Sequence, residues 1–196
     1  MQERPLSPQQ SLKLIENMIS KTREDISRQS PYFLLWGWGT LIGCVGQFVL
    51  KVLMDYERHY LVWLITIPEL VLTFYLISRQ RKRTQIRTYI AENMRTLWLA
   101  VGICFLILSL LFIKVGWLNC FPFFMLLYGL GSFVSGKILR FNAFIVGGII
   151  SWLLAAIAIW FDFDYQAIFA AAAILFGYII PGHLFRNMRE KEKSSV

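Results

Sequence analysis

The chain has 196 residues, of which 57% are hydrophobic and 16% are charged. An ordinary soluble domain has about 25% charged residues and about 45 to 50% apolar ones, so this balance excludes disorder and argues against a water-soluble fold. The net charge of +8 would suit nucleic-acid binding, but no nucleic-acid module is recognisable and the basic residues lie in blocks between long apolar stretches. We therefore expect an all-α integral membrane protein whose surroundings are the lipid bilayer and which binds no nucleic acid.

The first 31 residues are polar and carry both signs of charge. Between residues 9 and 28, apolar side chains recur at spacings of three and four, as at Leu12, Ile15 and Ile19, which predicts an amphipathic helix. We expect 1–31 to be a cytoplasmic segment. Its helix either lies along the membrane surface or docks a cytoplasmic protein partner.

Six apolar stretches follow, each close to the length of about 20 residues that a helix needs to cross a bilayer. They lie at 32–53, 60–77, 97–113, 118–136, 142–161 and 165–185. The connections after the first, third and fifth stretches are very short, which makes the helices that they join antiparallel neighbours. The sequence therefore predicts six transmembrane helices over 32–185, arranged as three antiparallel hairpins.

Lys and Arg residues are unevenly distributed between the alternate sides of these spans. Seventeen of the twenty lie in the N-terminal segment, the connection 79–96, the connection 137–141 and the tail 186–196. The positive-inside rule then places both termini in the cytoplasm. We expect a bacterial-type inner-membrane protein with a second cytoplasmic amphipathic helix in the basic connection 79–96 and a cytoplasmic polar tail over 186–196.

Glu69 is the only charged residue well inside a predicted span. It falls about 13 to 14 Å from the outer end of its helix, near the bilayer midplane, where an ionised side chain costs about 2.5 to 3.5 kcal/mol. Thr66 and Thr73 share its helix face, and Pro68 beside it predicts a kink. Candidate partners at similar depth on other spans are Ser109, Tyr128 and Ser151.

Three interpretations of Glu69 are open. The carboxyl could be protonated and hydrogen-bonded between helices as a packing element, or it could be a proton or cation site in transport or gating. It could also pair with its counterpart across a homodimer interface. A single acid without a basic partner makes an incomplete relay, and a polar path around it would have only Gln47 and a few hydroxyls to draw on.

Small residues recur four positions apart within several spans, a spacing that lets helix backbones approach closely. Examples are Gly39 with Gly43, Ser132 with Gly136, Gly147 with Ser151, and Ala173 with Gly177. We expect most of these pairs to pack helices within one chain, and only secondarily to form a dimer face.

No motif predicts catalysis. The sequence has no HExxH pattern, no intramembrane pair of aspartates and no glycine-rich phosphate loop, and its three cysteines lack metal or disulfide spacing. We expect no catalytic, cofactor or metal site, and interpret the acidic residues and His59 of the short connections as turn residues. The expected function is a non-catalytic interaction or regulatory membrane component. The alternative is a small dimeric transporter or channel in which Glu69 handles a proton or cation.

Overall fold

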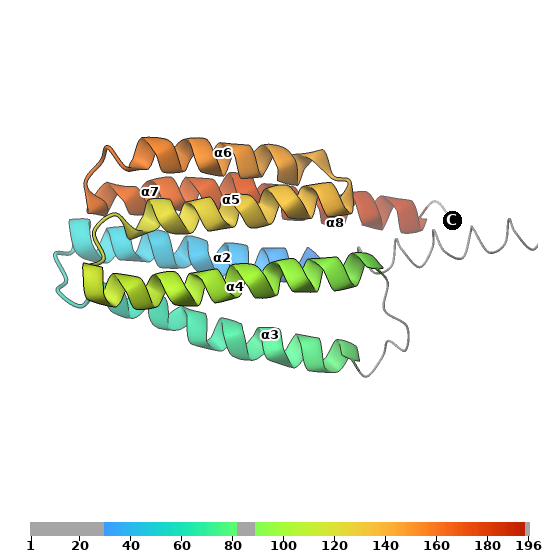
Figure 1. The fold of residues 1–196 in the computed structure, drawn as a ribbon, viewed down its shortest axis with the longest axis horizontal. Helices are drawn as coiled ribbons and strands as arrows, with labels where there is room; N and C mark the ends of the chain where they lie inside the picture. The colour runs from blue at the N-terminus through green and yellow to red at the C-terminus, as the bar shows by residue number, and fades with distance from the viewer. Residues whose placement is uncertain (1–29, 82–88, 195–196) are drawn as a thin grey trace, which may run out of the picture.

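The computed structural model describes residues 30–81 and 89–194, and these residues form helices joined by short turns, without a strand. The helices run along one long axis of the molecule (Figure 1). In chain order they are α2 (Ser30–Phe48), the π-helix η1 (Val49–Leu53), the 3₁₀-helix η2 (His59–Ile65), α3 (Thr66–Arg81), α4 (Tyr89–Val115), α5 (Cys120–Leu139), α6 (Asn142–Ala158), α7 (Phe163–Ile174), the π-helix η3 (Leu175–Ile179) and α8 (Ile180–Ser194).

Five helical segments of the described chain are long and apolar enough to cross a membrane. They are Pro31–Leu53, His59–Arg79, Ile90–Val115, Cys120–Leu139 and Phe163–Met188. The sixth predicted span coincides with α6, which is apolar but has only 17 residues. The all-helical fold and the apolar, membrane-type helices are therefore confirmed, and the sixth crossing stays a prediction.

The apolar side chains of α3 and α4 are largely exposed. Val71 and Phe74 on α3 are 64% and 66% exposed, and Leu106 and Leu110 on α4 are 62% and 59% exposed. Soluble monomers rarely expose contiguous apolar patches larger than a few hundred Å². A surface of this kind is stable in hydrocarbon, which makes this a membrane protein.

Glycines join α5, α6 and the α7–η3 segment in the tightest packing of the molecule. A Cβ atom at Gly147 would lie 2.5 Å from the backbone oxygen of Phe176, and one at Gly148 would lie 2.7 Å from the backbone oxygen of Gly129. Both distances are shorter than real Cβ contacts, so these backbones can approach only where a side chain is missing. The small residues predicted to pack helices within the chain do so here.

The π-helical turn η3 is followed by Pro181, which has no backbone N–H. The carbonyl of Gly177, four residues earlier, therefore lacks its α-helical donor. The hydroxyl of Ser132 on α5 lies 2.8 Å from that carbonyl oxygen. Tyr178, in the same turn, donates to the backbone oxygen of Tyr128 at 2.8 Å, so η3 is anchored to α5 twice.

The second predicted span changes helix type near Pro68. Residues 59–65 form a 3₁₀-helix and the α-helix begins at Thr66. Pro68 therefore falls in the first turn of α3, where a missing N–H breaks no α-helical hydrogen bond. The hydroxyl of Thr66 donates to the backbone oxygen of Trp63 at 2.8 Å across the junction. The irregularity that Pro68 predicts thus takes the form of a change of helix type.

Two predicted segments outside the spans can be compared with the structure, except that residues 82–88 of the basic connection lie outside the described residues. Residues 89–96 of the basic connection are the first two turns of α4 and continue into the third span, since no proline or glycine interrupts the helix there. Their apolar face packs inward, because Met94 is 1% exposed and lies in a core cluster with Phe33 and Phe144. The tail is helical as far as Ser194. The predicted helix between residues 9 and 28 lies outside the described residues.

Candidate functional site

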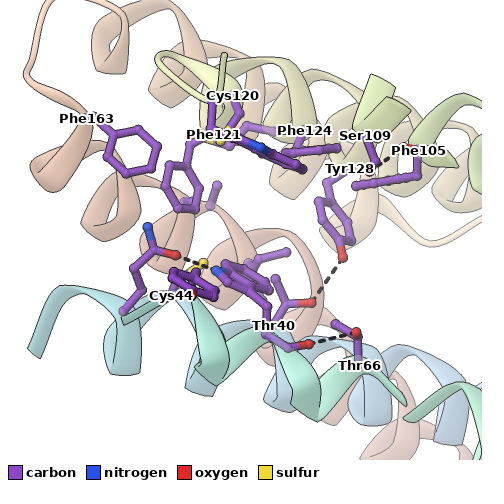
Figure 2. A pocket seen from close by; sticks show the side chains of 18 of the residues that line it. Thr40, Cys44, Thr66, Phe105, Ser109, Cys120, Phe121, Phe124, Tyr128 and Phe163 are labelled. Atoms are coloured by element: carbon purple, nitrogen blue, oxygen red, sulfur yellow. Dashed lines mark hydrogen bonds between the residues drawn. The ribbon is translucent and has the colours of Figure 1, made fainter. Parts of the chain in front are cut away.

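A cavity of about 780 Å³ lies between α2, η2, α4, α5 and α7. This volume is within the range of about 300 to 1,000 Å³ that is usual for small-molecule sites. Aromatic side chains form much of its wall. In Figure 2, Phe121 and Phe124 of α5 and Phe163 of α7 lie across the space from Thr40 and Cys44 of α2.

The cavity exists because small residues on α7 and α2 lie next to a bulky tryptophan on η2. Ala170 and Ala173 of α7 both line the cavity, and their short side chains leave room next to α2. On the opposite side Trp63 of η2 packs over α2, so that a Cβ atom at Gly43 would lie 3.0 Å from its ring. Gly43 thus gives the large ring of Trp63 the space to lie along the wall of the cavity.

Hydroxyl groups lie at one end of the cavity, which we call the Thr40 end. The hydroxyls of Thr40 and Tyr128 are 3.0 Å apart and join α2 to α5 (Figure 2). Thr66 and Ser109 also line the cavity, but each donates its proton to a carbonyl of its own helical segment. The structure thus brings three of the predicted residues, Thr66, Ser109 and Tyr128, to one cavity.

Glu69 is buried between α3 and α2, only 5% exposed. Its carboxyl group occupies the position where a side chain of Gly39 would begin, so the glycine provides its space. Neither carboxyl oxygen has a hydrogen-bond partner within 30–81 and 89–194. Thr73, on the same face, donates to the backbone oxygen of Glu69 at 2.8 Å and accepts a bond from the indole N–H of Trp36 at 3.1 Å. The predicted polar face of α3 therefore packs against protein.

The hydroxyls predicted as partners of Glu69 do not bind it. Ser151 is completely buried and its oxygen lies 2.9 Å from the carbonyl oxygen of Gly147 and 3.3 Å from that of Ala173. It belongs to the α6–α7 contact, whereas α3 packs against α2 and η2. Equal depth along the helix axis does not bring two residues into contact, because they can lie on opposite sides of a bundle.

Charged and polar groups lie at the other end of the cavity, next to the turns 54–58 and 116–119, which we call the turn end. Lys51 lines the cavity, forms an ion pair with Asp164 and stands 4.8 Å from the ring centroid of Phe163. His59 lines the same end, and its Nδ1 atom is buried without a hydrogen-bond partner in the described chain. No cluster of three His, Cys, Asp or Glu suited to a metal occurs among the described residues.

Gln47, which the sequence predicts only as a candidate for a polar path around Glu69, lies between the two ends of the cavity. Its side-chain oxygen accepts a hydrogen bond from the indole N–H of Trp63. An indole nitrogen can only donate, so the amide oxygen must face Trp63 and the NH₂ group must point elsewhere. Gln47 is 5% exposed and lines the cavity, and its NH₂ group has no acceptor among the residues described. The sequence feature that marks this residue is a side-chain amide inside the apolar span 32–53.

The cavity therefore has an aromatic body and polar groups at three levels. These are the Thr40 end, the Gln47 amide in the wall, and the Lys51 and His59 side chains at the turn end. No known protein family, curated protein or solved structure matches the chain. We therefore infer the function from the shape and the lining residues of this cavity.

Proposed function

We propose that the chain is a non-catalytic inner-membrane protein that holds an apolar molecule of lipid size in the cavity and acts as a binding or regulatory component. The observation that carries this proposal is the cavity of about 780 Å³ with a mainly apolar wall that is rich in aromatic side chains. An empty space of that size leaves the side chains around it without van der Waals partners. A long apolar molecule restores those contacts, and the few polar groups orient it.

We also propose that the chain crosses the membrane six times, as three hairpins with both termini in the cytoplasm. The unequal distribution of Lys and Arg supports this orientation. Helix α6 has 17 residues, which is the lower limit of the range of about 17 to 25 residues that spanning helices have. The turn end of the cavity would then face the outside. A membrane-impermeant thiol reagent applied to intact cells should label Glu57→Cys and leave Arg83→Cys unlabelled.

Photolabelling tests the binding function. A long-chain alkane that carries a diazirine should label the protein in nanodiscs saturably, at peptides that contain Phe121 and Phe124. Ala170→Phe places a ring inside the cavity and should abolish the saturable labelling. Ile168→Phe is the matched control, because Ile168 lies on the same helix but is 44% exposed on its outer surface. Unchanged labelling of a folded Ala170→Phe protein would remove the proposal.

One observation favours a second function, the transport or conduction of a proton or cation, in which case the protein would act as a dimer. Glu69 is a buried carboxyl without a hydrogen-bond partner in the described residues. The Thr40–Tyr128 pair would connect it to the cavity. This alternative predicts proton or cation flux into reconstituted vesicles that Glu69→Gln abolishes. Absence of flux in the unaltered protein would count against it.

A regulatory component needs a partner that responds to the bound state. We propose that the amphipathic helix predicted between residues 9 and 28 docks a cytoplasmic protein. Deletion of 1–28 should change the set of proteins that co-purify with the chain. An identical set of co-purifying proteins would contradict the docking role and favour a helix that lies along the membrane surface.

A further inference from the structure

We propose that the cavity selects a neutral long-chain molecule that carries a carbonyl-type oxygen, and that the side-chain NH₂ group of Gln47 donates the hydrogen bond that holds this oxygen. The inference rests on the proposed binding function and names the chemical class of its ligand.

Gln47 presents unused hydrogen-bond donors to the cavity. Trp63 fixes the orientation of the amide, because its indole N–H takes the oxygen and leaves both amide protons on the other side. The side chain is nine-tenths buried, and no described residue accepts from its nitrogen. The nitrogen is not among the fully enclosed side-chain atoms that lack a partner, so it is accessible from the cavity. A ligand oxygen in the cavity would supply the missing acceptor.

A carbonyl oxygen suits this position better than a hydroxyl group. It accepts a hydrogen bond from one of the amide N–H groups, and it brings no proton that would need an acceptor in an aromatic wall. The residues Phe121, Phe163 and Ala170 of α5 and α7 also line the cavity, and none of them has a polar side-chain atom that could accept a hydroxyl proton.

The charge around the cavity favours a neutral ligand over an anion. Lys51 is the only Lys or Arg among the lining residues that the structure describes, and it is already paired with Asp164. Its ammonium group also stands over the ring of Phe163. A carboxylate or phosphate drawn to Lys51 would have to lie beside the negative charge of Asp164, and like charges in contact are unfavourable.

Gln47 lies deeper in the membrane than the ester carbonyls of bilayer lipids, which favours a separate molecule as the ligand. Gln47 precedes Leu53, the end of its apolar segment, by six residues, which is about 9 Å along a helix. The ester carbonyls of bilayer lipids belong to the interfacial region outside a hydrocarbon core about 30 Å thick. We therefore assign the site to a separate molecule whose carbonyl lies deeper than those esters.

Two photolabels of equal chain length test the proposal in vesicles of ether-linked lipids, whose chains carry no carbonyl group. One is a diazirine alkane and the other a diazirine methyl ketone. The ketone should label the cavity peptides about fivefold more strongly, which is the effect of one hydrogen bond. Gln47→Met removes the donors at similar volume and should bring the two probes to equal labelling. Val45→Met, an exposed position on the same helix, should retain the preference.

The outcomes separate the ligand class from the function. Equal labelling of the unaltered protein by both probes overturns the ketone preference and leaves the binding function intact. No saturable labelling by either probe overturns the binding function itself. A fatty acid of the same length should compete less well than the ketone, and stronger competition would overturn the neutral class. A severalfold loss of ketone labelling in vesicles of ester-linked lipids would assign the site to bilayer lipid instead.

Discussion

The two sides of the helix bundle are packed in opposite ways. On the α5–α6–α7 side, glycine allows the backbones to meet, as at Gly147 and Gly148. Between α2, α4 and α5, by contrast, large aromatic side chains such as Phe105, Phe121 and Phe124 surround a cavity of about 780 Å³. Close backbone contact stabilises helix pairs in lipid, where no hydrophobic effect drives association. The comparison indicates a rigid side that supports the fold and an open side that is free to bind.

The largest effect should come from a side chain added on the rigid side. Gly147→Ala places a methyl group against backbone atoms of Phe176 and Gly177, which cannot move without separating the helices. We expect a loss of about 1 to 3 kcal/mol of stability, as for other overpacked sites. Reversible unfolding in mixed micelles measures it. Gly102→Ala is the control, since nothing lies within 4 Å of its Cβ position, and equal losses in both variants would contradict the account.

A smaller effect is expected where α3 meets α2. Gly39→Ala forces the Glu69 side chain into another rotamer, and such a shift costs about 0.5 to 1.5 kcal/mol. Because the clash involves the end of a flexible side chain, Glu69→Ala should restore the stability lost by Gly39→Ala. A double-mutant cycle on unfolding free energies measures this coupling. Additive effects would mean that the two residues are not in contact.

The smallest effect should come from the hydrogen bond between Thr40 and Tyr128. Thr40→Val and Tyr128→Phe both remove it, and their double-mutant cycle should give a coupling of about 0.6 kcal/mol, the average for bonds between membrane helices. Ser109→Ala in combination with Tyr128→Phe should give none, because Ser109 bonds to its own helix. A coupling as large for the second pair would show that the cavity end is rearranged.

Segment length and hydropathy were sufficient to predict the helices, because both are local properties of the chain. The prediction of Glu69 as an unusual residue had the same basis, since it is the only charge deep in a span. The structure adds that Gly39 makes its space. That contact joins two helices, and neither helix alone contains the information.

The cavity could not be predicted for the same reason. It depends on which faces of α2, α5 and α7 meet, whereas the sequence yields only the depth of each residue along its helix. Ser151 was grouped with Glu69 by depth and lies in another helix contact. The sequence marks Gln47 only as a polar residue in an apolar span, whereas its free donors depend on the hydrogen bond from Trp63 to its oxygen.

An experimental density map of the chain, purified from its native membrane into lipid nanodiscs, tests the central claim most directly. We expect an elongated density between α2 and α5 that passes Phe121 and Phe124 and comes within hydrogen-bond distance of the Gln47 nitrogen. Direct contact of α2 with α4 and α5, with no space between them, would contradict the account.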